Sequence, residues 1–246
     1  METSNKIKAD TIVWKYMDYP SFISLLIDKF LVFNRLDNFT DTLEGTLPKN
    51  AQKEYQEYLK TKMLTDDEAA LRVKNEVDHI SKYKKGTYAN CWSIGNEENY
   101  ALWKIYLKNS NDGVAIKCTI KRLTDCLVHT SEIDNNEKII VKEVNYTELK
   151  FSDVNQINIS TTKDVAYRYE DELRLLIKNQ RDLKKKIDEQ EQTLDVILIP
   201  VDVQNLIEKI YISPFAKPWL TKTTLKILKQ LNYENITIDN SRVLEK

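Results

Sequence analysis

The sequence is poor in the residues that mark several common classes of protein. Its 246 residues include only 4 Gly, 5 Pro, 3 Cys and 2 His. So few glycines argue against a glycine-cradled phosphate site or a loop-rich, low-complexity chain. The three cysteines form no CxxC pair, and such an odd, sparse set fits a reducing cytoplasm without a disulfide framework. Neither His79 nor His129 has a partner at a spacing typical of a zinc site or a serine-hydrolase triad.

The chain also lacks a strong charge bias and long apolar runs. Its net charge is −1 although 30% of the residues are charged, so the whole protein has no electrostatic attraction to nucleic acid. No run of about 18 apolar residues occurs, and the opening METSNKIKAD contains no apolar segment of the secretory type. We therefore expect a cytoplasmic protein with no membrane association, folded as a single domain over 1–246.

Short apolar runs and amphipathic segments alternate irregularly along the chain, and several runs are adjacent. This pattern predicts an α+β fold with a split, mostly antiparallel mixed sheet flanked by helices. A polar, charged stretch predicts a helical insertion at about 49–84, and 179–192 reads as a charged excursion. Strands are predicted at 11–17, 30–35, 86–94, 114–120, 138–147, 170–177, 194–201, 209–214 and 235–239, and helices at 19–29, 97–107, 202–208 and 218–231.

The segment YRYEDELRLLI at 167–177 places three acids directly before an apolar run. If the strand begins at these acids, Glu170 and Glu172 share one face of it and Asp171 points to the other. Two carboxylates that close raise one another's pKa, and one of them can then contact a ligand hydroxyl or stabilise a developing cation. The alternative is a helix end, where Glu170 forms an ordinary i,i+4 pair with Arg174.

Two further motifs carry polar groups inside apolar segments. In WKYM (14–17), Lys15 must be solvated or paired at its tip, so it either binds a phosphate or carboxylate or lies on an edge strand. In CWSIGNEENYALWKIY (91–106), the flat rings of Trp92, Trp103 and Tyr106 could clamp a nicotinamide or a base. The hydroxyl of Ser93 could orient a ribose there. For Trp103, packing in the core between helix and sheet is the alternative.

The ordered segments WKYMDYPSFISLLIDKFLVFNRLDNFTDTLEG, NCWSIGNEENYALWKIYLKNSNDGVAIK and YRYEDELRLL resemble the bacterial family called domain of unknown function 2971. The resemblance covers nearly the whole chain and implies a single domain, but it implies little about activity. Its acidic stretch is matched at these positions: Phe33, Arg35, Asp37, Asp41, Glu44 and Gly45.

The chain is also similar, over fewer residues, to ADP-ribosyltransferases. Those enzymes carry a His or Arg on the first strand, a Ser or Tyr on a middle strand, and a Glu, often as E-x-E, before a later strand. Lys15, Ser93 and the Glu170/Glu172 pair occur here in that order.

This second similarity implies an NAD-using transferase that acts as a toxin or phage-defence effector. Its acceptor would be a nucleic acid or a protein, and an antitoxin or other complex partner could accompany it. By the same similarity Glu172 would contact the nicotinamide ribose and stabilise the oxocarbenium-like state, and Glu170 would position or deprotonate the acceptor. Lys15 and Arg35 would hold the pyrophosphate, with Tyr16 also at the cofactor, and Trp92, Trp103 or Tyr106 would stack on the nicotinamide.

Two other functions remain open from the residues. The acids Asp37, Asp41 and Glu44 could join Glu170 and Glu172 around Mg²⁺ in a nuclease-like effector, since that ion needs several oxygen ligands. Alternatively, the charged segments could contact a partner protein in a non-enzymatic binding module.

Overall fold

The computed structural model describes residues 2–3, 7–41, 44–108, 110–127, 139–178 and 195–243. The charged excursion predicted at 179–192 lies outside these residues. In the described part of the chain no helix is both long and apolar enough to cross a membrane.

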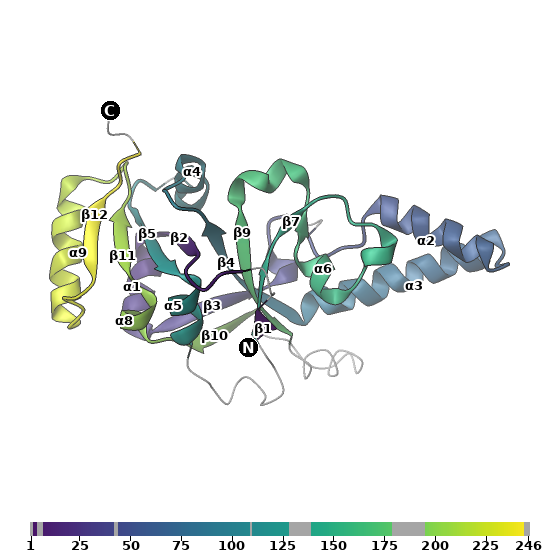
Figure 1. Cartoon of the computed structure of the whole chain (residues 1–246), viewed down its shortest axis with the longest axis horizontal. Helices are drawn as coiled ribbons and strands as arrows, with labels where there is room; N and C mark the ends of the chain where they lie inside the picture. The colour runs from purple at the N-terminus through teal and green to yellow at the C-terminus, as the bar shows by residue number, and fades with distance from the viewer. Residues whose placement is uncertain are drawn as a thin grey trace.

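One mixed, mostly antiparallel sheet organises the fold, which confirms the predicted α+β class (Figure 1). Along the sheet the strands follow the order β1-β6-β9-β4-β2-β5-β11-β12, and β3 and β10 form a branch beside β4. Only the β1–β6 and β11–β12 pairs are parallel among the described strands of this sheet. The strands are β1 (Glu2–Thr3), β2 (Ile12–Asp18), β3 (Phe30–Arg35), β4 (Thr87–Ile94), β5 (Gly113–Thr119), β6 (Ile140–Glu143), β9 (Glu172–Lys178), β10 (Val196–Pro200), β11 (Lys209–Ile212) and β12 (Thr237–Asn240).

The sheet forks at β4, because two strands use the same edge of it. β2 pairs with β4 only at Val13 and Trp14, which face Ile94 and Ser93. Further along this edge β2 is replaced by β3, which pairs with Ala89 and Tyr88 of β4. The sheet therefore splits into two branches, one running through β2 and β5 and the other through β3 and β10.

The largest hydrophobic cluster fills the space between these two branches, and we call it the main core. It takes residues from both branches and from the helix that joins them, α1 (Tyr19–Asp28), as illustrated by Val13, Phe22, Phe33 and Ile197. Leu173 and Leu175 of β9 point into this core. Because side chains alternate along a strand, Glu172 and Arg174 point to the other side of the sheet. We call that other side, which carries Trp14, Ser93 and Glu172, the outer face.

The helices cover the sheet and extend it at both ends. α4 (Tyr100–Leu107) lies on the outer face over β2, and α9 (Pro218–Gln230) packs its Leu220 and Leu228 into the main core. The shorter helices are α5 (Ile120–Asp125), α6 (Gln156–Ser160) and α8 (Val203–Leu206), with 3-10 turns η1 (Leu36–Asn38), η2 (Phe151–Asp153) and η3 (Val165–Glu170). β7 (Asn145–Tyr146) and β8 (Thr162–Lys163) pair in a separate small sheet.

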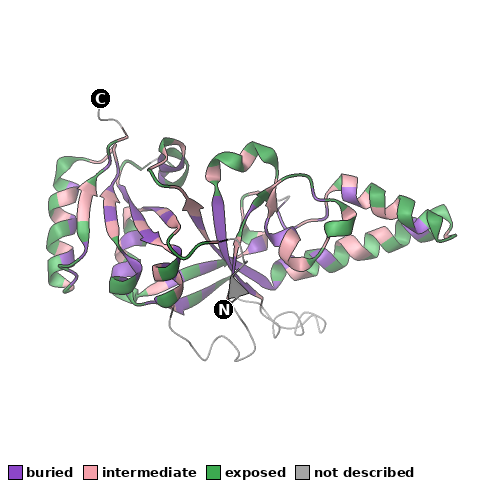
Figure 2. Cartoon of the chain, viewed as in Figure 1, coloured by how far each residue is buried: buried purple, intermediate pink, exposed green. Residues whose placement is uncertain are grey.

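The predicted charged insertion forms a helical hairpin of α2 (Lys49–Thr61) and α3 (Asp66–Lys85). It projects from the end of the molecule opposite α9, and most of its surface is exposed (Figures 1 and 2). Thr65 begins α3 with a capping box completed by Glu68, which fixes the turn between the two helices. A small cluster built from Leu47, Ile80 and Leu149 joins the base of the hairpin to the rest of the fold.

A Gly113→Ala substitution should destabilise the fold, because β5 begins where two backbones come close together. A Cβ at Gly113 would lie 2.6 Å from the carbonyl oxygen of Met17 and 2.1 Å from Leu107 Cδ2. We expect the free energy of unfolding to fall by about 1–3 kcal/mol, measured by urea denaturation. The matched control is Gly95→Ala, whose Cβ would meet its nearest neighbour at 3.4 Å. Equal losses in both variants would contradict this packing.

Candidate functional site

The acidic motif is not the continuous strand that its alternation predicts. Glu170 ends the 3-10 turn η3, Asp171 adopts the left-handed conformation (φ 39°), and β9 starts only at Glu172. The two glutamates therefore do not share a face through strand alternation, which corrects that expectation. Their side chains nevertheless meet, because both bind the amine of Lys163 from β8.

Five ionised side chains form a buried network on the outer face of β9. Lys163 Nζ lies 2.7 Å from Glu44 and 2.6 Å from Glu170. The guanidinium of Arg174 binds Glu172 Oε1 at 2.8 Å and Glu44 Oε2 at 2.9 Å, and it donates to the carbonyl of Ser160. We call this set the ion network, and its members are Glu44, Lys163, Glu170, Glu172 and Arg174.

The ion network carries a surplus of negative charge, since three carboxylates share two cations. Burial alone would raise the pKa of Glu172, but the charge and hydrogen bonds of Arg174 outweigh it and lower that pKa to about 2. Burial likewise works against the charge of Arg174, whereas Glu172 raises its pKa above the usual value. Both groups therefore stay ionised at neutral pH.

The members of the ion network differ in how far a ligand could reach them. Both oxygens of Glu172 are taken, Oε1 by Arg174 and Oε2 by Arg174 and Lys163, and its side chain is 4% exposed. The side chain of Glu170 is 13% exposed, and its Oε1 has no partner in the described part of the chain. Glu170 is thus the carboxylate best placed to contact a bound molecule.

Ser93 lies beside these acids, as the transferase similarity requires. It is the cross-strand partner of Glu172, and its hydroxyl donates to the carbonyl oxygen of Glu170 at 2.7 Å. Cys91, the next residue along this face of β4, is close enough to Glu172 for the two groups to act on each other's pKa. Burial, and then the charge of Glu172, raise the pKa of the Cys91 thiol, so this cysteine stays protonated at neutral pH.

Lys15 bridges β2 and β4 at the point where the two strands separate. Because β2 leaves β4 after Trp14, the carbonyl of Cys91 has no strand partner there, and Lys15 Nζ donates to it at 2.9 Å. The same amine lies 5.5 Å from the centre of the Trp92 ring. Burial lowers the pKa of Lys15, while the negative charge of Glu172 opposes that change. Lys15 thus lies near Glu172, but it shares the core side of β2 with Val13 and Met17, whereas Ser93 and Glu172 lie on the outer face, and its amine already has a protein partner.

Two tyrosines lie next to this group on the outer face. Tyr16 and Tyr106 stack with their ring centres 6.4 Å apart, and Tyr106 is 41% exposed. The hydroxyl of Tyr16 accepts a hydrogen bond from the backbone of Asn99, which ties it to the start of α4. Tyr106 is thus partly exposed near the acids, as is Tyr169, which precedes Glu170.

Three residues expected at the cofactor lie elsewhere. Trp92 points into the main core and donates its indole N–H to Asn90, and Trp103 is fully buried against Tyr16. Their ring faces are covered by protein, so burial speaks against a stacking role for either one. Arg35 shares the core side of the sheet with Tyr88 and pairs with Asp37 and Asp195. Arg35 therefore lies away from the outer face that carries Glu172.

The carboxylates of the metal alternative are gathered only in part. Glu44 does join Glu170 and Glu172, but Lys163 and Arg174 occupy the space between them. Asp37 pairs instead with Arg35. Within the described residues no group of three or more His, Cys, Asp or Glu side chains is arranged to hold a metal ion.

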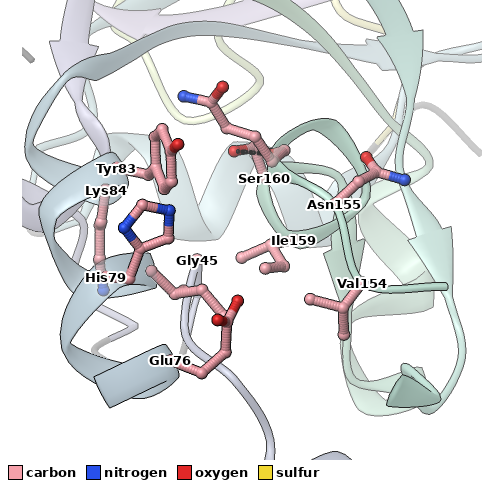
Figure 3. A pocket seen from close by; sticks show the side chains of 11 residues that line it. Gly45, Glu76, His79, Tyr83, Lys84, Val154, Asn155, Ile159 and Ser160 are labelled. Carbon is pink, nitrogen blue, oxygen red and sulfur yellow. Dashed lines mark hydrogen bonds between the residues drawn. The ribbon is translucent and has the colours of Figure 1, made fainter. Parts of the chain in front are cut away.

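A pocket of about 180 Å³ lies between α3 and α6 (Figure 3). Glu76, His79 and Tyr83 from one side of α3 face the apolar Val154 and Ile159 across it. The pocket adjoins the network through two other residues: Gly45 follows Glu44, and Ser160 accepts from Arg174. In the sequence His79 has no partner at a spacing typical of a metal or catalytic site. The i,i+3 and i,i+4 spacing of Glu76, His79 and Tyr83 nevertheless indicates that they share one polar face of a helix.

The substitution Arg174→Met should destabilise the fold far more than the loss of a surface cation does. It removes the partner of two buried carboxylates, so the free energy of unfolding should fall by about 3–5 kcal/mol in urea denaturation. Lys121→Met provides the control, because Lys121 pairs with Asp125 on an exposed helix surface and should cost about 0–1 kcal/mol. Similar losses in both variants would show that the ion network is not buried as described.

Acid should weaken the fold through Glu172. Its folded pKa of about 2 lies below the unfolded value of about 4.3, so its contribution is complete above that higher pKa and disappears as pH falls toward the lower one. Urea midpoints measured across this range should fall less steeply for Glu172→Gln than for the unchanged protein. Parallel curves would contradict the assigned pKa.

Comparisons of the chain with protein-family models, with curated proteins and with solved structures found no match. The resemblances to domain of unknown function 2971 and to ADP-ribosyltransferases therefore stay predictions that rest on the residues themselves.

Proposed function

We propose that this chain is an NAD-using enzyme of the ADP-ribosyltransferase type, with its reacting centre on the outer face at the fork of the sheet. The observation that carries the proposal is the direct pairing of Ser93 with Glu172, beside Lys15 at the fork. These residues come from three strands and keep the chain order of the transferase signature. In this reaction the bond between nicotinamide and ribose C1′ breaks, nicotinamide leaves with the bonding electrons, and an acceptor oxygen or nitrogen bonds to C1′ and loses a proton.

The charge of the ion network supports the proposal on physical grounds. When nicotinamide leaves, the ribose develops positive charge, and a fixed negative charge in a buried setting stabilises such a state strongly. The network holds one carboxylate more than it has cations, and Glu172 stays ionised at neutral pH. We therefore assign this electrostatic role to the network as a whole rather than to Glu172 alone.

Glu170 is assigned the contact with the acceptor. Its unpaired Oε1 can accept the proton that the acceptor loses, a role for which a positioned carboxylate is suited. Ser93 would hold the turn at Glu170 in place through its hydrogen bond to the Glu170 carbonyl, and the exposed face of Tyr106 would stack on the nicotinamide ring. Lys15 is a positioning residue in this scheme, because its amine fixes the fork rather than facing a ligand.

The test is release of nicotinamide from NAD, measured by chromatography with and without cell lysate, together with transfer of label from NAD to lysate components. Glu170→Gln should lower the rate about a hundredfold or more, the usual size of a general-base effect. Asp171→Asn is the matched control, because it makes the same acid-to-amide change one residue away on an exposed side chain and should stay within about twofold. No release by the unchanged protein, or equal losses in both variants, would reject the proposal.

Cleavage of RNA or DNA by the purified protein tests the metal alternative. Cleavage that needs Mg²⁺ and is lost with EDTA would favour a nuclease instead.

A partner-binding module is the second candidate, and the α2–α3 hairpin is what favours it. Apolar side chains are exposed along this projecting hairpin: Tyr58, Met63 and Leu71. A chain that leaves NAD intact but co-purifies in fixed ratio with one protein, and loses it when Met63 and Leu71 are changed to serine, would support that candidate.

A further inference from the structure

Within the described residues, the outer face of β5, β11 and β12 is covered only in part, by α4 and by Phe215 and Val243, which pack against the Trp14 cluster. On the opposite face of the same strands, α9 and the main core bury Ile116, Ile210 and Ile212. On the outer face, none of the side chains in this area is fully buried: Lys117, Thr119, Lys209, Tyr211, Thr237 and Asp239. As far as the described residues go, these side chains are therefore at least partly accessible to a ligand.

Cations and aromatic rings alternate over this open area. Lys117 Nζ lies 5.8 Å from the centre of the Trp14 ring, and that ring lies 5.1 Å from Tyr211. At the upper border Lys104 of α4 lies 3.7 Å from the centre of the Phe215 ring and 5.7 Å from that of Tyr100, which is 47% exposed. We call Lys104, Lys117, Lys209, Tyr100 and Tyr211 the lysine–aromatic surface.

The arrangement of lysines on this surface is costly for the free protein. Lys117 and Lys209 are direct cross-strand partners, and like charges at such positions repel. Asp239 neutralises Lys209 at 2.8 Å, but neither Lys104 nor Lys117 has an acidic partner within the described residues. An anionic ligand that binds here would relieve the repulsion.

A row of cross-strand partners links the lysine–aromatic surface to the proposed reacting centre, although Trp14 in the middle of that row is only 3% exposed. Cross-strand pairing forms one row on the outer face, in which each residue is the partner of the next: Lys209, Lys117, Trp14, Ser93 and Glu172. Four strand spacings separate the ends of the row, a distance of about 19 Å. An extended molecule held on the lysines would therefore need to span about 19 Å, across the covered Trp14, to reach Glu170.

We propose that the lysine–aromatic surface binds single-stranded nucleic acid and, resting on the function proposed above, presents it as the acceptor of ADP-ribose. Lysines that contact phosphates and exposed rings that stack on bases are the combination by which proteins hold single strands. A duplex would leave the rings without unstacked bases to contact, and an acidic protein segment would use the lysines but not the rings.

The binding test is fluorescence anisotropy of a labelled short oligouridylate between about 50 mM and about 200 mM salt. The double variant Lys104→Gln/Lys117→Gln should weaken binding and reduce the slope of log affinity against log salt by about 0.7 for each phosphate that is no longer neutralised. The control Lys222→Gln/Lys226→Gln makes the same charge change on exposed positions of α9 and should leave binding unchanged.

Three results would overturn the proposal: no binding, equal weakening in the two double variants, or displacement of the oligonucleotide by polyglutamate as effectively as by unlabelled oligonucleotide. Tyr100→Ala supplies an independent test, because loss of a stacking ring should weaken binding about five- to a hundredfold. An unchanged affinity would remove the stacking part and with it the preference for single strands.

Labelled NAD added to the same complex separates this proposal from the function on which it rests. Binding without any nicotinamide release rejects the transferase while the nucleic-acid surface stands. Nicotinamide release without oligonucleotide binding rejects the surface while the transferase stands. Release with bound but unlabelled oligonucleotide rejects its role as acceptor.

Discussion

The arrangement of this protein follows from one constraint, which is that β2 and β3 use the same edge of β4. A strand edge can satisfy only one partner at each position, so β2 must leave where β3 begins. The separation creates the space that the main core fills and leaves the Cys91 carbonyl without a strand partner. Lys15 supplies the missing donor, and in doing so it lies beside the strand that carries Ser93.

The ion network depends on that same geometry, because the paired β4 and β9 fix the outer face on which Glu172 and Arg174 project. Buried ion pairs are rarely the cheapest way to stabilise a fold, since apolar residues of similar volume often serve as well or better. In the proposed function, the surplus charge of this network acts on the positive charge that develops on a bound molecule. The surplus carboxylate, the partly exposed Glu170 and the partly exposed Tyr106 would then belong to one site.

Much of the fold could be read from local patterns. The run FLVFNR became β3 at its predicted bounds, the amphipathic 19–29 and 218–231 became α1 and α9, and the charged insertion became two helices. The pairing of Ser93 with Glu172 was also predictable, because each lies on a recognisable strand. The assignment of both Ser93 and Trp92 to one site overlooked strand alternation, because Ser93 on the outer face places its neighbour Trp92 in the main core.

Long-range partners set the limit of the sequence reading. Arg174 binds Glu44, which lies 130 residues away, and Lys163 belongs to a two-residue strand with no pattern of its own. The break at Asp171 was hidden as well, because nothing in EDEL marks a left-handed residue as a glycine would. Without that break Glu170 would lie in the strand and could not approach Lys163 from the turn.

The α2–α3 hairpin occupies a special position in the chain. It is inserted between β3 and β4, which are hydrogen-bonded neighbours, so its two ends emerge close together at one place on the sheet. The entropy of closing such a connection grows only slowly with its length. The outer part of the hairpin could therefore change in length while the forked sheet keeps its shape, whereas its base, which packs against Leu149, is part of the interior.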